Sequence, residues 1–435
     1  MKTKRTKRTN MGIQGRLKAG MRRLAALLLA AAMLSAFLAG CGTGTDNVSA
    51  KPLSPSGPAA AAKQCLILVI SGHANMPRPS LPGDVRRMVM DAAEGLGYLS
   101  IICIDGKPSI YTDGNGREFK GWIGSSAPYA PRREKDNAEF VGKIETLLSE
   151  GLTARYPETD ILAALTLAAR EASSSDAKGM NVKVIVCDSG ISTKGWISFK
   201  EPGMWGVEPN EFAEGLFSRG ELPAFDGKTC LSWLYLGDTM EPQEALSNAQ
   251  RTHLQDLYAA VLKKAGVENP EFLTDTPGSK ESLSAHPVTP VGLPVADYSD
   301  LAAKGTVTLR QEVLHFIPDT DRFLDADEVR KALTPIVDMV REDGSLRLRL
   351  TGMTASARSD DKSFVLELSK ARAERVKEAI VEMSGIDPGR IETVGVGDNQ
   401  DPVIDPSLEH DPDTDAQGRL TAAAAKNRLV RIEIL

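Results

Sequence analysis

The sequence predicts two globular domains, a doubly wound α/β domain followed by a smaller α+β domain. Short apolar runs alternate with helical patterns through the first half of the chain, which favours a mainly parallel sheet with helices on both faces. A stretch rich in proline and glycine then interrupts the pattern, and a second series of strands and helices follows. The length of 435 residues also fits two hydrophobic cores better than one.

The first forty residues have the order of a secretory leader, in which a basic stretch precedes an apolar one. Nine lysines and arginines come before the apolar run at residues 24–38. A run of about 15 residues is shorter than the roughly 20 that a membrane-spanning helix needs, so we expect removal of the leader. Because the first basic residues lie far from the apolar run, both Met1 and Met21 remain open as the start of the protein.

The leader ends in Leu-Ala-Gly-Cys at residues 38–41, which resembles the bacterial lipobox. The resemblance implies a lipoprotein signal peptide at residues 1–40 and a mature N-terminus at Cys41, whose thiol accepts a palmitate-containing lipid anchor. The alternative is an ordinary leader that happens to contain a cysteine. Gly42 offers no acidic retention signal, so we expect the outer membrane in a two-membrane cell and otherwise the outer face of the plasma membrane.

Removal of the leader leaves an acidic protein. The formal net charge of the whole chain is -6, and the leader carries nine of the positive charges and no negative one, so the mature chain has a net charge of about -15. Nucleic acid is not an expected partner, because its phosphate backbone selects basic surfaces.

Cysteine and histidine spacing indicates neither a metal site nor a catalytic one. No Cys-x-x-Cys pair occurs, and the five histidines fall into no Ser/His/Asp or metal-ligand pattern. We therefore predict a protein that is not an enzyme and needs no cofactor. The cysteines after the lipobox are expected to be buried free thiols rather than disulfides, and they lie at positions 65, 103, 187 and 230.

Two segments are predicted to connect the folded parts. Residues 41–63 consist mainly of Gly, Thr, Ser, Pro and Ala, so they bury too little surface to offset the entropy of ordering, and we expect a disordered tether. Residues 269–304 contain several prolines, each of which removes a backbone donor. This linker separates an N-terminal domain at residues 64–268 from a C-terminal domain at residues 305–435.

Regular elements of both types are predicted in the N-terminal domain. The expected strands are Cys65 to Ile70, Leu99 to Ile104, Val182 to Cys187 and Leu231 to Leu236. The expected helices are Val85 to Gly95, Ala138 to Glu150, Thr159 to Ser173 and Ala245 to Ala265. A long insertion at residues 111–133 contains Trp122 and Tyr129 among glycines and prolines, and we expect it to carry a surface for a protein partner.

The C-terminal domain is predicted to be a small sheet covered on one face by two helices. The expected strands are Thr306 to Phe316, Ser345 to Gly352, Arg390 to Gly397 and Arg428 to Leu435. The expected helices are Ala326 to Arg341 and Lys362 to Met383. An acidic, proline-rich loop precedes the last strand.

Six blocks stand out in the C-terminal domain: Val313 to Phe316, Leu350 to Gly352, Leu368 to Ala373, Gly385 to Ile391, Gly395 to Gly397 and Asn427 to Ile432. Their residues and their order resemble those of OmpA/MotB-like domains, a peptidoglycan-binding family. The resemblance covers about the last 130 residues and implies the βαβαββ fold of the family. It also implies non-covalent binding of the peptidoglycan stem peptide.

The diaminopimelate of that peptide carries an ammonium and a carboxylate at one end. Such a zwitterion needs an acid for the ammonium and a guanidinium for the carboxylate. Arg372 stands where the family has its binding arginine, and Gly352 and Thr354 match the family's Gly-His-Thr-Asp motif. The acid of that motif is replaced by Ala355, which puts the ligand in doubt but not the fold.

Two explanations for the missing acid remain open. Asp360 or Asp361 in the following loop could meet the amine, or the ligand is an amidated peptide for which the acid matters less. The resemblance also implies ligand contacts for Asn427 and Arg428. The alternative for Arg372 is a helix-surface ion pair, and for Asn427 it is a turn that caps the last strand.

Two segments of the N-terminal domain contain a recognisable pattern, Thr159 to Leu165 and Val184 to Gly190. They resemble the corresponding segments of a von Willebrand factor A domain. In that family Mg²⁺ is held by oxygens from three loops, the first of which reads Asp-x-Ser-x-Ser, whereas residues 71–75 read Ser-Gly-His-Ala-Asn. We therefore expect a degenerate, metal-free domain. The remaining polar residues, expected to act as hydrogen-bonding struts, are Thr159, Asp188 and Ser189.

These observations predict a cell-envelope lipoprotein that holds peptidoglycan through its C-terminal domain and presents its N-terminal domain to a partner. The alternative is an adhesion or assembly factor, in which the N-terminal domain binds a protein and the C-terminal domain is a degenerate scaffold.

Overall fold

The computed structural model describes residues 63–435, except residue 79 and residues 149–151, 153, 274–287, 356–361, 414 and 417–420. The leader, Cys41, the tether up to residue 62 and the candidate acids Asp360 and Asp361 lie outside the described residues. Residues 61–435 form a single compact unit.

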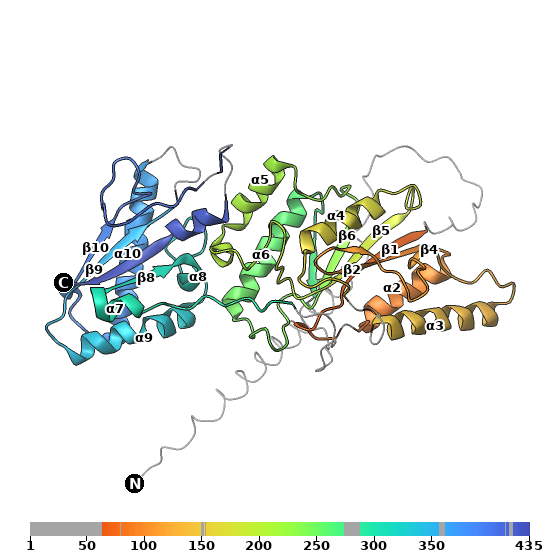
Figure 1. The fold of residues 1–435 in the computed structure, drawn as a ribbon, viewed down its shortest axis with the longest axis horizontal. Helices are drawn as coiled ribbons and strands as arrows, with labels where there is room; N and C mark the ends of the chain where they lie inside the picture. The colour runs from red at the N-terminus through yellow and green to blue at the C-terminus, as the bar shows by residue number, and fades with distance from the viewer. Residues whose placement is uncertain are drawn as a thin grey trace, which may run out of the picture. The chain divides into compact units, whose positions relative to one another are not determined.

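A seven-stranded sheet forms the centre of the N-terminal domain (Figure 1). Its parallel strands are β1 (Gln64–Ser71), β2 (Tyr98–Ile104), β5 (Asn181–Cys187), β6 (Cys230–Leu234) and β7 (Glu271–Leu273). Two short strands, β3 (Ser109–Ile110) and β4 (Lys120–Trp122), pair antiparallel with β2. The order is β3-β2-β1-β5-β6-β7, so the connections leave β1 and β5 in opposite directions. Polar loops after these two strands therefore lie at the edge where α/β folds usually bind ligands.

Helices cover both faces of this sheet (Figure 1). Alternate residues of β1 point to opposite sides, and each set joins a separate apolar core. One core includes α4 (Ile161–Ala172), α5 (Pro209–Arg219) and α6 (Asn248–Lys264), together with the short helix η2 (Met204–Gly206). The other core includes α2 (Gly83–Glu94) and α3 (Ala130–Thr146). Burial on both faces explains why the central strands are almost entirely apolar.

The C-terminal domain is built on a four-stranded sheet in the order β10-β9-β11-β8. Its strands are β8 (Thr306–Arg310), β9 (Leu348–Met353), β10 (Ile391–Gly395) and β11 (Leu429–Ile434). Its helices are α7 (Ser299–Lys304), α8 (Gln311–Leu314), α9 (Ala326–Glu342) and α10 (Lys362–Ser384), with short helices η3 (Pro388–Arg390) and η4 (Ala422–Asn427). α9 and α10 pack on the sheet in one apolar core (Figure 1).

Most of the predicted elements are present, and most of their ends differ from the prediction by a few residues. The start of the helix predicted at Ala138 is wrong, because α3 begins at Ala130 and includes the end of the predicted insertion. The prediction of a strand from Thr306 to Phe316 is wrong beyond Arg310. His315 has a φ of 44°, which a strand cannot contain, and the side chain of Gln311 donates to the Phe316 carbonyl across the turn. Helix α5, strand β7 and the strand β4 inside the insertion were not predicted from the sequence.

None of the four cysteines in the described part of the chain forms a disulfide, as predicted. Cys65, Cys103 and Cys187 are buried, whereas Cys230 is exposed, contrary to expectation. Burial raises the pKa of the Cys103 thiol to about 12, so this group stays protonated and unreactive at neutral pH. Among the helices that the structure describes, none combines the length and the apolar character needed to cross a membrane.

Gly352 allows α10 to lie directly against β9. A Cβ atom added at this residue would lie 2.0 Å from the backbone oxygen of Ser369, so even alanine would push the helix off the sheet. We expect Gly352→Ala to lower the free energy of unfolding by about 1–3 kcal/mol, measured by urea denaturation of the full chain. The control is Gly344→Ala, because a Cβ atom there meets nothing within 4 Å. Equal effects of both substitutions would contradict this account.

Candidate functional site

Arg372 is a buried cation on α10. Its side chain is only 5% exposed. Nε donates to the Thr320 carbonyl at 3.0 Å, and the guanidinium lies 4.9 Å from the centre of the Phe316 ring. Burial lowers the pKa of Arg372 to about 10, and the charge of Arg428 adds to this effect. The group is thus still charged at neutral pH, yet no carboxylate of the described residues forms an ion pair with it.

A cavity of about 480 Å³ lies beside this guanidinium, which is within the size range of small-ligand sites. Thr354 and Ala355 line it together with Arg372. The Thr354 backbone N–H donates to the Gly397 carbonyl, but its buried hydroxyl has no hydrogen-bond partner in the described structure. Buried hydroxyls usually have a partner, so the unpaired Thr354 hydroxyl is an unusual feature of the cavity wall.

The wall of the cavity contains four carboxylates, although Ala355 supplies none. Asp319 lies in the loop after Phe316, directly before Thr320, whose carbonyl accepts the hydrogen bond from Arg372. The negative charge of Asp319 also acts on Arg372. The other three, Glu208, Glu211 and Asp256, come from the N-terminal domain. Opposite charges for a zwitterion are therefore present around one cavity, in places that the motif does not identify.

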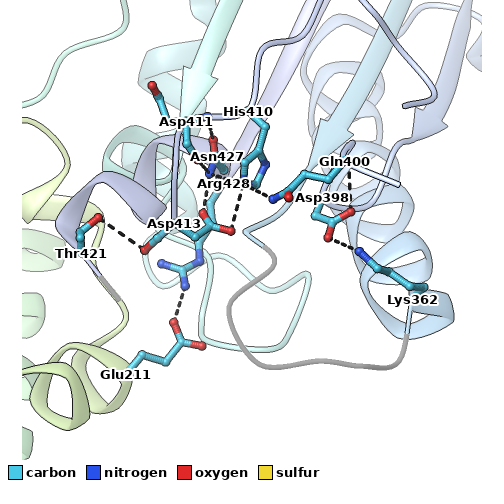
Figure 2. Close-up of polar contacts among 10 residues, drawn as sticks. All are labelled: Glu211, Lys362, Asp398, Gln400, His410, Asp411, Asp413, Thr421, Asn427 and Arg428. Carbon is cyan, nitrogen blue, oxygen red and sulfur yellow. Dashed lines mark hydrogen bonds and ion pairs between the residues drawn. The ribbon is translucent and has the colours of Figure 1, made fainter. Parts of the chain in front are cut away.

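Arg428 and Glu211 join the two domains at the edge of this cavity (Figure 2). Nη2 of Arg428 lies 2.5 Å from Oε2 of Glu211, and both side chains are largely buried. Glu208 is also engaged, because its carboxylate caps α5 by accepting from the backbone N–H groups of Asn210 and Glu211. The resemblances to the OmpA/MotB-like family and to the lipobox gave six candidate residues. Three of them line this cavity: Thr354, Arg372 and Arg428.

Asn427 has different neighbours. It is 1% exposed and holds the acidic loop before β11 (Figure 2). Its amide donates to the Asp411 carbonyl at 2.8 Å and to Asp413 Oδ1 at 2.5 Å, while its oxygen accepts from the Asp411 backbone at 2.9 Å. Neither Asn427 nor Gly352 lines the cavity. Gly352 lets α10, which lines the cavity, lie against β9, whereas Asn427 fastens the acidic loop outside the cavity wall.

The predicted polar residues of the N-terminal domain meet at the ends of β1 and β5. Thr159 Oγ1 donates to the Ile191 carbonyl, Asp188 Oδ1 accepts from Gly190 and Ser189 Oγ accepts from Ile191. His73 Nε2 lies 3.4 Å from Asp188 Oδ2, without the alignment of a hydrogen bond. Within the described part of the chain, no group of three or more His, Cys, Asp or Glu side chains could hold a metal ion.

Sequence reasoning missed Glu211, Asp256 and Asp319. Glu211 lies on α5 and Asp256 lies on α6. Neither belongs to a sequence motif, because their place at the cavity depends on which face of the N-terminal domain packs against the C-terminal domain. Asp319 could have been found, since it lies three residues after the matched Phe316.

The pKa of His410 makes the acidic loop sensitive to pH. Burial lowers this pKa, but the hydrogen bond and charge of Asp413, 3.0 Å away, outweigh burial and raise it above its ordinary value of 6.5. A pKa raised by folding stabilises the protein below the unfolded value, and this contribution disappears as the pH rises through the folded value.

We therefore expect the stability difference between the protein and its His410→Gln variant to shrink as the pH rises from 6 to 8, measured by thermal unfolding. The buried His253 and His315, whose pKa values burial lowers to about 4, are common to both proteins and cancel in the difference. Asp413→Asn should abolish the same pH dependence. A difference that grows with pH would contradict the assignment.

Comparison with known proteins agrees with the geometry of the C-terminal domain. Residues 316–412 match the model of the OmpA family. No curated protein sequence matches the chain. Among solved structures, the chain is similar to the periplasmic domain of Helicobacter pylori MotB, with 17% identity over 30% of this chain and 74% of that one, at a TM-score of 0.23.

Two further solved structures are similar over the same share of the chain. The cell wall anchor of the type VI secretion system from Pseudomonas aeruginosa is 26% identical, covered to 80%, with a TM-score of 0.23. An outer membrane protein from Borrelia burgdorferi B31 is 19% identical, covered to 88%, with a TM-score of 0.21. At these TM-scores the likenesses carry no argument of their own, and it is the family match that places an OmpA-family domain in the C-terminal part of this chain.

Proposed function

We propose that the protein is a non-catalytic component of the bacterial cell envelope that binds the peptidoglycan stem peptide in the cavity beside Arg372. The observation that carries this proposal is a buried guanidinium without a carboxylate partner among the described residues, next to an unpartnered hydroxyl of Thr354. A ligand carboxylate satisfies the guanidinium, because guanidinium binds carboxylate through two parallel hydrogen bonds.

The amine of the ligand needs a carboxylate close to the same guanidinium. Asp319 is the acid of the C-terminal domain that lines the cavity and acts electrostatically on Arg372. Its φ of 55° is in the left-handed region, which aspartate tolerates better than most residues. We assign to Asp319 the role that the family gives to the acid replaced here by Ala355.

The remaining parts of the proposal concern attachment and the N-terminal domain. Cys41 carries the lipid, residues 41–63 are the tether, and the protein faces the wall from a membrane leaflet. The strand order with an antiparallel edge and the polar groups after β1 and β5 support a von Willebrand factor A-like domain. This domain presents a surface to a protein partner.

A second candidate function is adhesion or assembly, in which the N-terminal domain carries the binding activity. The observation that favours it is the insertion at residues 111–133, where Trp122 is 59% exposed and Tyr129 is 74% exposed. Exposed aromatic side chains are typical anchors of protein interfaces. If the full chain loses its protein partner on Trp122→Ala and Tyr129→Ala but never binds peptidoglycan, this second function is the correct one.

We expect Arg372→Ala to reduce binding of the full chain to purified peptidoglycan sacculi by about ten-fold or more, measured by sedimentation over a range of protein concentrations. Arg372→Lys should give an intermediate loss, because an ammonium keeps the charge but cannot form the two parallel hydrogen bonds. The control is Arg330→Ala on α9, an exposed arginine that pairs with Asp327 and Glu382 away from the cavity. Unchanged pelleting of Arg372→Ala would refute the proposal.

Lipid attachment is tested separately. We expect Cys41→Ser to move the protein from the membrane fraction to the soluble fraction and to abolish its labelling by radioactive palmitate in growing cells. Cys230→Ser is the matched control, since Cys230 is the exposed cysteine of the folded part and its loss should change neither property. Membrane retention with undiminished labelling in Cys41→Ser would favour an ordinary leader.

A further inference from the structure

The N-terminal domain forms one wall of the cavity that contains Arg372. Trp205, Val207 and Pro209 contribute its apolar part, and Glu211 and Asp256 contribute carboxylates. The two domains pack closely beside it, since a Cβ atom at Gly203 would lie 2.6 Å from the Ala422 carbonyl oxygen. The cavity is therefore a property of both domains, whereas the matched OmpA-family segment covers only residues 316–412.

The ion pair between Glu211 and Arg428 determines the charge of this cavity. Arg428 lines the cavity and its positive charge acts on Arg372, so two guanidinium groups face the same space. Two unpaired cations would attract a ligand with two carboxylates. Glu211 contacts Arg428 at 2.5 Å, and the two side chains are 17% and 13% exposed, so the pair is shielded from water and strongly coupled.

The other titratable groups around the cavity do not offset this effect. His253 and His315 are neutral at pH 7, because burial lowers the pKa of each to about 4. Glu208 is occupied in capping α5. Asp319 and Asp256 remain as carboxylates that favour an amine. With Arg428 neutralised, Arg372 is the single cation without a carboxylate partner among the described residues of the cavity wall.

We propose that the N-terminal domain sets the ligand selectivity of the C-terminal domain, with Glu211 as the positioning residue that reserves the cavity for a zwitterionic ligand. Glu211 acts through Arg428: it holds the second guanidinium and removes its attraction for a second carboxylate. The inference deepens the proposed function and rests on it, because it concerns the same cavity. We therefore expect the cavity to bind a diamino dicarboxylate and to reject the corresponding dicarboxylate without amino groups.

The test compares two small ligands of the same chain length. meso-Diaminopimelate carries two ammonium groups and two carboxylates, whereas pimelate carries the carboxylates alone. The affinities of the full chain for both are measured by isothermal titration calorimetry at pH 7 and low salt. For the unmodified protein, we expect measurable binding of diaminopimelate and weaker binding of pimelate.

Glu211→Gln should shift the ratio of the two affinities toward pimelate by roughly ten-fold, because loss of the Glu211 charge makes the cavity more positive. The added positive charge attracts the dianion pimelate and repels the ammonium groups of diaminopimelate. Pimelate should bind more tightly and diaminopimelate more weakly. A merely structural role of Glu211 would weaken both ligands together. Glu214→Gln is the matched control, since Glu214 lies one turn further on α5 and pairs with Lys264 at the surface.

The outcomes separate this inference from the proposed function. If diaminopimelate binds in an Arg372-dependent manner but Glu211→Gln leaves the ratio unchanged, or weakens both ligands equally, the selectivity inference is wrong and the proposed function stands. If the unmodified protein binds neither ligand and does not pellet with sacculi, both are wrong. Thermal unfolding of each variant ensures that the compared proteins are folded.

Discussion

A single buried guanidinium, that of Arg372, determines the chemistry of the cavity. A charge that is removed from water without an opposite charge is strongly destabilising, and Arg372 has only the Thr320 carbonyl and the face of Phe316 as described partners. Such a residue persists when the surrounding structure leaves it no other position. Here α10 lies against β9 so closely that the backbone contact at Gly352 has no room for a side chain, and the guanidinium is fixed at the cavity.

The negative charges that accompany this cation come from elements distant in sequence. Asp319 belongs to the loop after α8, and Glu211 belongs to α5 of the other domain. Adjacent residues meanwhile act in different places: Asn427 fastens the acidic loop within its own domain, while Arg428 reaches across to Glu211 (Figure 2). The family motif implies ligand contacts for both Asn427 and Arg428. In this structure both side chains contact protein residues instead.

Local pattern was sufficient for most of the fold, because strands buried on both faces and amphipathic helices leave distinct periodicities. The strand predicted from Thr306 to Phe316 ends at Arg310 in the structure. The apolar residues Val313 and Leu314 continue the strand-like pattern in the sequence, but the backbone turns at His315. Burial of Arg372 was not predictable, since its helix position also suits a surface ion pair. Nor was the role of Glu211, because it depends on a contact between domains for which the sequence has no periodic signal.

The loss of the family's acid at Ala355 need not mean the loss of its ligand. Recognition of a zwitterion depends on the field in the cavity, and several carboxylates at different positions can produce a similar field. In this chain Asp319 lies close enough to influence Arg372, and Glu211 removes the competing charge of Arg428. Because one of these two acids belongs to the N-terminal domain, any movement of that domain relative to the cavity changes the charge that the ligand meets. Binding of a partner to the N-terminal domain and binding of the wall peptide to the cavity would then influence each other to the same extent in both directions.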